Sequence, residues 1–177
     1  MKKVYKFLVS LSITSLILTA MVILFKTNGY ILNTTSSYPI GIYKITKKDL
    51  YNKGTLVSFC APQNNTIKKL VEYGFAASNA TCKNGTPVLL KKLVALEGDK
   101  ITIINNHVYI NTILQPKSKI FFVGRSGNYL ERQNSQIINK GNFWAMSDYN
   151  ERSYDSRYYG QVSLDNIKGA AMPVLTW

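Results

Sequence analysis

A pair of lysines inside an apolar run is the feature of this 177-residue sequence that most directly suggests chemistry. Residues 88–96 read VLLKKLVAL, and alternate side chains of a strand share a face, so Lys91 falls in one apolar row and Lys92 in the other. Burial disfavours the ammonium form and lowers the pKa of a lysine, and a neutral amine can take a proton from a serine nucleophile. The alternative is a lysine that extends its charged end into water.

The segment around Pro39 offers hydroxyl groups. Residues 33–43 read NTTSSYPIGIY. The proline fixes its own φ and pushes Tyr38 into an extended conformation, which suits a nucleophile held at a fixed angle. Serines and threonines beside a proline are more often ordinary turn residues, so this segment alone predicts a stiff turn.

A third segment, residues 145–160, reads AMSDYNERSYDSRYYG and concentrates charged and hydroxyl residues between a strand and a glycine. Asp155 and Arg157 are close enough in sequence to form an ion pair within a turn. The alternative is a solvated polar loop, because connecting segments usually run over the surface.

The small number of histidines and cysteines narrows the possible mechanisms. The chain has two cysteines, Cys60 and Cys82, and one histidine, His107, so these residues cannot supply a zinc site. His107 falls within INNHVY at 104–109, which predicts a hairpin turn and a surface position. A serine hydrolase of this sequence therefore needs a base other than histidine.

The N-terminal segment predicts a membrane anchor. Lys2, Lys3 and Lys6 precede an uncharged run at 7–25, which Lys26 ends. At 1.5 Å rise per residue, a helix over this run nearly spans a hydrocarbon core of about 30 Å. The run is longer than the apolar stretch of a cleaved signal peptide, the competing interpretation, so we favour an uncleaved signal anchor.

This interpretation divides the chain into an N-terminal anchor at 1–28 and a domain at 29–177. The lysines before the span place the N-terminus in the cytoplasm, although Lys26 and Lys44 beyond it oppose this orientation. The domain is then expected to face the periplasm or the cell exterior.

The side of the membrane on which the domain lies determines how the two cysteines are interpreted. In an oxidising compartment, Cys60 and Cys82 most simply form one disulfide. The bond would close a loop of about 20 residues and contribute about 3 kcal/mol on the chain-entropy model. Two free buried thiols are the alternative, and they would fit a cytoplasmic domain.

The remaining pattern predicts a mostly β domain with a short helical insert. About 150 residues follow the anchor, enough to fold without a metal or a partner subunit. Strands are expected at 54–60, 88–96, 100–104, 107–110, 119–123, 142–146 and 172–175. Helical spacing over 67–77 places four apolar side chains on one face: Ile67, Leu70, Val71 and Phe75.

The charge balance favours a membrane over a nucleic acid as neighbour. The formal net charge is +13, from 22 Lys and Arg against 9 Asp and Glu. The basic residues are scattered singly or in pairs, without zinc-finger spacing, a basic heptad region or an RNA-binding aromatic signature. We therefore expect no nucleic-acid partner, and a basic domain beside anionic lipid is the alternative.

Taken together and in this order, the three polar segments resemble the signal peptidase I superfamily. A serine shortly before Pro39 resembles its nucleophile box, and KKLVALEGD at 91–99 resembles its general-base box. SYDSRYYG at 153–160 resembles its last conserved box and is the most specific match. The resemblance covers nearly the whole chain and implies a signal peptidase-like β domain with serine–lysine chemistry.

Within that superfamily the chain most resembles the TraF-type peptidases of conjugative transfer systems. Residues 33–43 contain that branch's opening pattern Asn-x-Thr-x-Ser-x-Pro-x-Gly-Ile-Tyr, and a cysteine pair between the serine and lysine boxes is similar to that branch too. The resemblance implies processing of a pilin subunit. In the best-known members, cleavage near the pilin C-terminus is followed by joining of the new end to the N-terminus.

The resemblance assigns the reacting groups by position. Ser37 is the expected nucleophile, with Ser36 as a rival because general signal peptidases place their serine three residues before the proline. Lys91 is the expected base. Backbone N–H groups near Ser37, with a hydroxyl such as that of Thr35 or Ser36, are expected to stabilise the oxyanion. No metal or organic cofactor is implied.

The supporting residues follow from the same match. Lys92 is expected to pair with Asp148, and Ser153 to hydrogen-bond the amine of the base and orient it. Asp155 and Arg157 are expected to form an ion pair that supports the last loop.

Several positions depart from the superfamily pattern. Glu97 replaces a proline, Ser147 replaces a glycine, and Tyr149 and Asn150 replace an Asn-Arg pair. No methionine follows the serine, which favours the TraF branch. The departures concern the last loop and the end of the lysine strand, and they leave the nucleophile and the base untouched.

Three functions are compatible with these features. The first is a membrane-anchored serine endopeptidase that processes a pilin, with or without cyclisation. The second is a general leader peptidase that cleaves exported preproteins, and the third is a non-catalytic pilus-assembly protein on the same fold. The expected partners are a pilin or preprotein substrate, the bacterial cytoplasmic membrane and other conjugative transfer proteins, with the catalytic domain in the periplasm.

Overall fold

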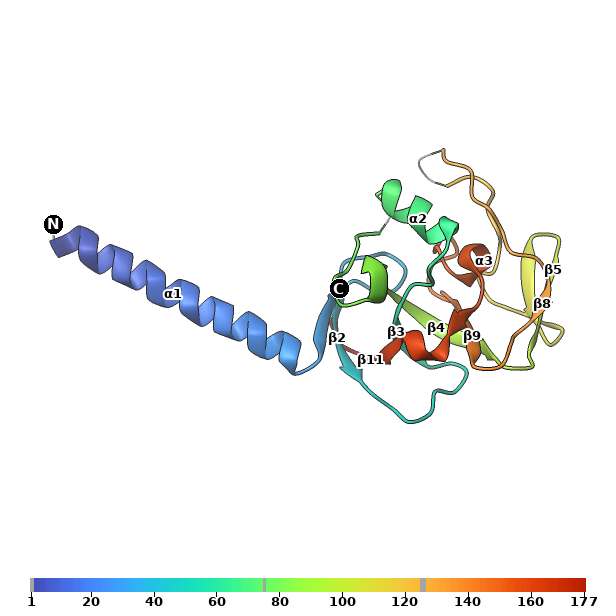
Figure 1. Ribbon diagram of the computed structural model, residues 1–177, viewed down its shortest axis with the longest axis horizontal. Helices are drawn as coiled ribbons and strands as arrows, with labels where there is room; N and C mark the ends of the chain where they lie inside the picture. The colour runs from blue at the N-terminus through green and yellow to red at the C-terminus, as the bar shows by residue number, and fades with distance from the viewer. Residues whose placement is uncertain (1, 75, 125–126) are drawn as a thin grey trace.

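A single long helix, α1 (Lys2–Thr27), projects from the rest of the molecule in the computed structural model, which describes residues 2–74, 76–124 and 127–177 (Figure 1). An 18-residue window within its segment Lys3–Thr27 has a mean hydropathy of 2.4 and is not buried, so α1 is long and apolar enough to cross a membrane. Hydroxyl groups along it bond back to carbonyls four residues earlier, which satisfies them within the helix: Ser12, Thr14 and Thr19.

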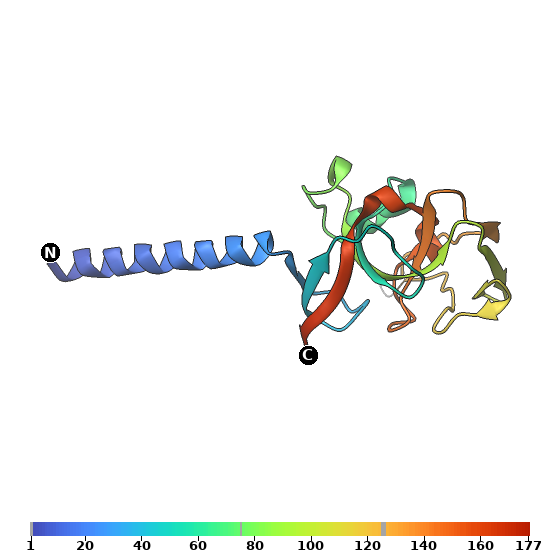
Figure 2. The same cartoon turned by 90° about the horizontal axis from the view of Figure 1, so that it is seen from below.

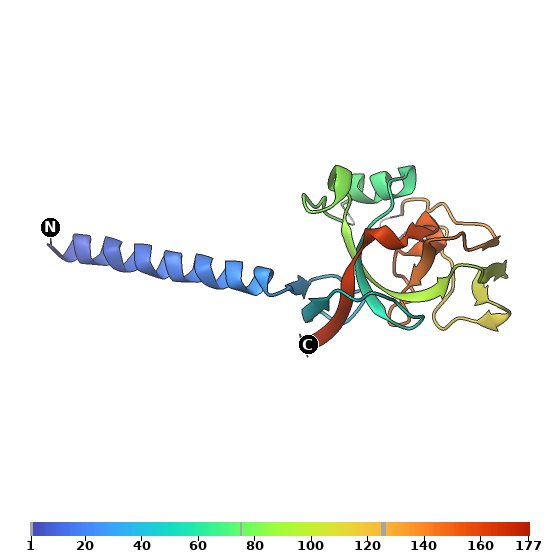
Figure 3. The ribbon, with the colours of Figure 1, turned by 60° about the horizontal axis from the view of Figure 1, so that its bottom comes forward.

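The domain that follows is built on a curled, seven-stranded sheet in the order β1-β2-β11-β3-β4-β9-β10. Neighbouring strands pair antiparallel throughout. Figure 3 shows the long, curved β4 running through the middle of the domain. The strands are β1 (Tyr30–Asn33), β2 (Gly41–Thr46), β3 (Leu56–Cys60), β4 (Val88–Leu96), β9 (Asn142–Met146), β10 (Val162–Ser163) and β11 (Ile167–Thr176).

A second, four-stranded sheet lies at the end of the domain farthest from α1 (Figure 1). Its central hairpin turns at Asn105 and Asn106, which both take positive φ as a type I′ turn requires. The hairpin strands match the ranges predicted from the sequence. In the order β7-β6-β5-β8 the strands are β7 (Ile113–Leu114), β6 (His107–Ile110), β5 (Lys100–Ile104) and β8 (Gln136–Ile137).

The short helices join and cap these strands. Helix α2 (Asn65–Glu72) is capped by Asn64, whose side chain accepts the N–H of Ile67. It lies within the loop that the Cys60–Cys82 disulfide closes. The other short helices are α3 (Ser156–Tyr159), η1 (Lys83–Gly85) and η2 (Leu164–Asn166).

The C-terminal strand β11 packs closely against the strand that follows the serine segment. Figure 2 shows the C-terminus beside the region where α1 meets the sheet. Gly41 lies opposite Thr176 with a φ of +153°, and a Cβ at this position would lie 2.1 Å from the Leu175 carbonyl oxygen. Only glycine allows β2 and β11 to approach here.

The structure confirms the mostly β class with a short helical insert and an N-terminal helix, and it corrects two predicted elements. The helix expected at 67–77 ends at Glu72, because Gly74 takes a left-handed φ of +72°; Phe75 lies outside the described residues. The strand expected at 119–123 is wrong. Only Val123 pairs there, in an isolated bridge with Tyr129.

Candidate active site

The serine segment forms a turn that one buried amide organises. Asn33, at the end of β1, donates its Nδ2 hydrogens to the carbonyls of Thr35 at 3.0 Å, Tyr38 at 3.1 Å and Pro39 at 3.0 Å. Its Oδ1 accepts the Thr35 N–H and the Thr35 hydroxyl. The turn is therefore fixed from inside, and the Thr35 hydroxyl is already engaged.

Two serines of the distant polar loop contact Ser37 in this turn. The Ser153 hydroxyl lies 3.4 Å from the Ser37 hydroxyl, and the Ser147 hydroxyl donates to the Ser37 carbonyl at 2.6 Å. Ser36 is more exposed, and both its carbonyl and its hydroxyl accept from the Asn150 side chain. The two candidate nucleophiles thus have different neighbours.

Lys91 lies in the middle of β4 and is only 3% exposed. Its Nζ donates to the carbonyl of Leu90 at 3.2 Å. Burial lowers the pKa of the Lys91 amine to about 8, since water no longer solvates the ammonium form. The nearby carboxylate of Asp155 opposes this shift, and the guanidinium of Arg157 adds to it.

The interior position of Lys91 follows from the alternation that the sequence predicted. On β4, Lys91, Leu93 and Ala95 are all buried, whereas Lys92 and Val94 are partly exposed. Within the part of the chain that the structure describes, the Lys91 amine makes no hydrogen bond to Ser37 or Ser153.

Lys92, on the other face of β4, forms an ion pair with Asp148. Tyr38, the residue after Ser37, donates its hydroxyl to the same carboxylate. Burial alone would raise the pKa of Asp148, but the hydrogen bonds from Lys92 and Tyr38 outweigh it and lower the pKa. Asp148 therefore stays ionised and ties the serine turn to the lysine strand.

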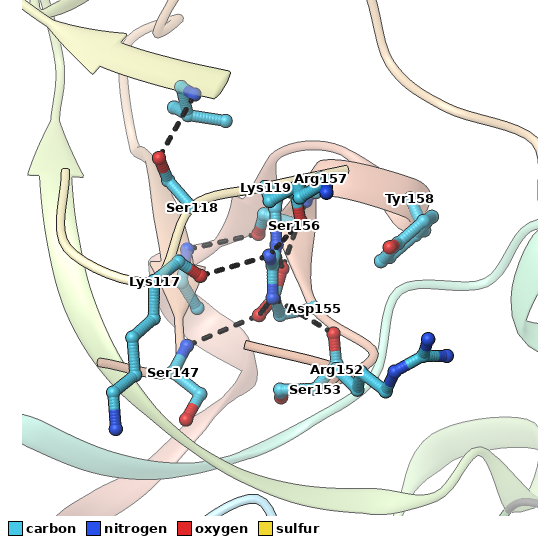
Figure 4. A network of polar contacts seen from close by, with 12 residues as sticks. Lys117, Ser118, Lys119, Ser147, Arg152, Ser153, Asp155, Ser156, Arg157 and Tyr158 are labelled. Carbon is cyan, nitrogen blue, oxygen red and sulfur yellow. Dashed lines mark hydrogen bonds and ion pairs between the residues drawn. The ribbon is translucent and has the colours of Figure 1, made fainter. Parts of the chain in front are cut away.

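A fully buried ion pair supports the polar loop (Figure 4). Arg157 donates from Nε and Nη2 to the two oxygens of Asp155, each at 2.8 Å, and neither side chain is exposed. Asp155 also accepts the N–H of Ser147 at 3.2 Å. Its carboxylate caps α3 by accepting the N–H of Arg157.

The remaining guanidinium hydrogens of Arg157 reach the main chain on both sides of the loop. Nη2 donates to the Ser153 carbonyl at 3.0 Å, and Nη1 donates to the carbonyls of Lys117 at 3.1 Å and Lys119 at 2.6 Å. Side chains thus bind the main chain of the stretch after Lys119 that was predicted as a strand: Arg157 binds the Lys119 carbonyl, and the Tyr158 hydroxyl accepts the N–H of Phe121. A buried guanidinium needs all of these acceptors.

The geometry thus brings most of the predicted site residues together around the serine turn. Ser37 contacts Ser153, Lys91 is close enough to Asp155 and Arg157 for their charges to affect its pKa, and Lys92 pairs with Asp148 on the other face of β4. The pairing of Cys60 with Cys82 is confirmed, with a Cα–Cα distance of 5.6 Å.

Sequence reasoning missed three contributors to this geometry. Ser147 and Asn150 were noted only as departures from a pattern, although both hold the serine turn. Asn33 was read as part of a motif without a role of its own. Its position at a strand end, two residues before a Thr, is a signal for such a turn-forming amide.

Comparison with known proteins adds a family context to this geometry. The family model described as signal peptidase, peptidase S26, matches residues 3–177. Two Escherichia coli proteins named plasmid transfer protein TraF are 33% and 31% identical to the chain, each covering 84% of both sequences. A crystal structure of a signal peptidase I from Enterococcus faecalis V583 is 19% identical, covers 71% of this chain and 98% of its own, and has a TM-score of 0.42.

The buried ion pair leads to a stability prediction. Arg157→Met leaves the Asp155 carboxylate buried without its partner, so we expect the free energy of unfolding to fall by about 3–5 kcal/mol. Lys68→Met removes an exposed lysine from its 4.0 Å pair with Glu72 and is the matched control, which should change little. Urea unfolding, followed by the fluorescence of buried Trp144, measures both. An Arg157→Met variant as stable as the control would contradict the prediction.

Proposed function

Because the chain belongs to the signal peptidase family, peptidase S26, we propose that it is a membrane-anchored serine endopeptidase in which Ser37 attacks a peptide carbonyl and Lys91 accepts the serine proton. The observation that carries the proposal is the burial of Lys91 close to Asp155 and Arg157. Arg157 also holds the carbonyl of Ser153, whose hydroxyl meets that of Ser37. A lysine amine with a pKa of about 8 is partly neutral near pH 7–8 and can act as a base.

The contacts of the two serines favour Ser37 over Ser36 as the nucleophile. The Ser37 hydroxyl meets Ser153, whose carbonyl is fixed by Arg157, a residue whose charge also affects Lys91. The hydroxyl of Ser36, which is exposed, instead accepts from the Asn150 side chain. Ser153 is suited to orienting the amine and the Ser37 hydroxyl together.

The proposed reaction is acyl transfer. As the bond forms between Ser37 Oγ and the substrate carbonyl carbon, Lys91 Nζ takes the hydroxyl proton. In the resting arrangement this amine donates to the Leu90 carbonyl, so it must turn toward Ser37, and hydrogen bonds of this kind often tighten only when substrate is bound. The main-chain N–H of Ser37 is the proposed donor to the oxyanion.

Breakdown of the tetrahedral intermediate completes the first half of the reaction. The peptide C–N bond breaks, Lys91 returns the proton to the leaving amine, and an acyl-enzyme remains on Ser37. Water then releases a carboxylic acid, whereas a substrate amine would form a new peptide bond. The same pair of residues therefore permits hydrolysis or cyclisation.

The proposed substrate is a pilin subunit of a conjugative transfer system, and the relatives support the transfer context. The two plasmid transfer proteins match the chain over most of its length. We place α1 as a membrane anchor with the N-terminus in the cytoplasm, so that the domain faces the oxidising side, where its disulfide would persist. A membrane-embedded pilin would present its cleavage site close to such a domain.

Replacement of each proposed reacting group tests the mechanism. Lys91→Met keeps a long apolar chain and removes the base, and Ser37→Ala removes the nucleophile, so both are expected to abolish processing of the co-expressed pilin. Ser36→Ala is the matched control and should retain most activity. Intact-mass spectrometry of the pilin measures the cleaved, cyclised and unprocessed forms.

The outcomes separate the alternatives. Full processing of the pilin by Lys91→Met would rule out the serine–lysine dyad. Loss of processing in Ser36→Ala but not in Ser37→Ala would identify Ser36 as the nucleophile. An unprocessed pilin with the wild-type protein, together with cleavage of an exported preprotein, would indicate a general leader peptidase. Processing of neither substrate would indicate a non-catalytic assembly role.

The lowered pKa of Lys91 predicts the pH dependence of acylation. Only the neutral amine is a base, so the rate should rise about tenfold per pH unit at low pH and level off above a midpoint of about 8. Release of p-nitrophenol from p-nitrophenyl acetate, with the Ser37→Ala background subtracted, measures the rate. A midpoint near the ordinary lysine value of 10.5, or a flat profile, would contradict the assignment.

A further inference from the structure

We propose that Ser147 is a positioning residue for acylation, because its hydroxyl fixes the main-chain carbonyl of the nucleophile Ser37. The inference rests on the proposed function, since it assigns a role in the same reaction. Ser147 stands where the superfamily pattern has a glycine, which could supply no hydroxyl. The contact is therefore a feature of this chain's own residues.

The direction of the Ser147 hydrogen bond follows from the groups around it. Ser147 is fully buried, and its Oγ lies 2.6 Å from the Ser37 carbonyl oxygen. Ser147 Oγ also accepts the main-chain N–H groups of Tyr149 at 3.2 Å and Asn150 at 2.9 Å. A hydroxyl has one hydrogen and two acceptor sites, so the single hydrogen must point at Ser37.

Ser147 is itself held by the buried ion pair. Its main-chain N–H donates to Asp155, while Arg157 donates to the carbonyl of Ser153. Ser147 and Ser153 then contact Ser37 at two different atoms, the carbonyl oxygen and the side-chain hydroxyl. The buried Asp155–Arg157 pair thus positions Ser37 through two residues, Ser147 and Ser153.

Fixing the carbonyl matters because it restrains rotation of the main chain at Ser37. That rotation would move the peptide group, and with it the direction of the side-chain hydroxyl toward the Lys91 amine. Reactions that depend on exact placement lose large factors in rate from displacements of about 1 Å. Lys91 keeps its burial when Ser147 changes, so its proton affinity should not respond.

The test compares Ser147→Ala with wild type in the full-length chain in detergent micelles. The probe is p-nitrophenyl acetate, which acylates a serine as the ester C–O bond breaks and p-nitrophenolate leaves, while the serine proton passes to the Lys91 amine. We expect the pre-steady-state acylation rate of Ser147→Ala to fall at least tenfold, with the pH midpoint unchanged. Ser147→Gly should lose the same factor, because both variants lack the hydroxyl.

Ser118→Ala is the matched control. Ser118 is also buried, and its hydroxyl accepts the main-chain N–H of Val108. Removing this hydroxyl therefore breaks a buried bond between a serine and the main chain at a place that does not contact Ser37. We expect this variant to acylate within twofold of wild type. Its melting temperature is compared with that of Ser147→Ala, which loses three hydrogen bonds instead of one. An equal loss of rate in Ser118→Ala would show that general loosening explains the effect and would overturn the proposal.

Two further results would also overturn it. Acylation of Ser147→Ala at the wild-type rate would show that the carbonyl contact is not needed, and a shifted pH midpoint would place the effect on Lys91 instead. Failure of the proposed function looks different, because Ser37→Ala would then acylate as fast as wild type. Ser37→Ala is therefore measured first.

Discussion

The removal of one lysine amine from water is the constraint on which the rest of the site depends. Lys91 lies in a strand whose neighbouring positions on the same face are apolar, and its burial favours the neutral amine. The carboxylate of Asp155 alone would favour the ammonium form and oppose this effect. Arg157 binds that carboxylate and carries the compensating charge, so the ion pair supports the loop without returning the proton to Lys91.

The same ion pair connects segments that are far apart in sequence. The turn after β1 carries Ser37, β4 carries Lys91, and the loop before α3 carries Ser147 and Ser153. A second pair, Lys92 with Asp148, joins β4 to the same loop on its other face and binds Tyr38 beside the nucleophile. The nucleophile turn is thus held by polar contacts on both faces of one strand, which suits a site that must place two atoms accurately.

The sequence predicted the parts of the fold that local pattern controls. The bounds of β4, β5, β6 and β9 match the expected ranges, because their apolar residues are continuous or alternate and glycine or asparagine turns follow several of them. The strands β1 and β2 were missed, since Pro39 and the nearby hydroxyl residues suggested only a turn. β2 pairs with β1 on one side and with the distant strand β11 on the other, and no local pattern reveals the second pairing.

The site was predictable where residue type alone implied the chemistry. A lysine in an apolar row indicated a lowered pKa, and an Asp and an Arg two residues apart indicated an ion pair. The roles of Ser147 and Asn150 could not be predicted, because they arise from contacts more than a hundred residues apart in the chain. The strand expected after Lys119 was wrong because side chains from α3 bind its main chain: Arg157 binds the Lys119 carbonyl, and the Tyr158 hydroxyl accepts the N–H of Phe121.

The pKa of the Lys91 amine in the resting protein tests the central claim most directly. NMR of protein labelled with carbon-13 at the lysine Cε positions reports each ammonium separately, and the Lys91 resonance is the one missing from Lys91→Met. The account predicts that this resonance titrates with a pKa of about 8, below that of the other lysines. Titration near 10.5 would mean that the amine is solvated and charged, and it would contradict the account.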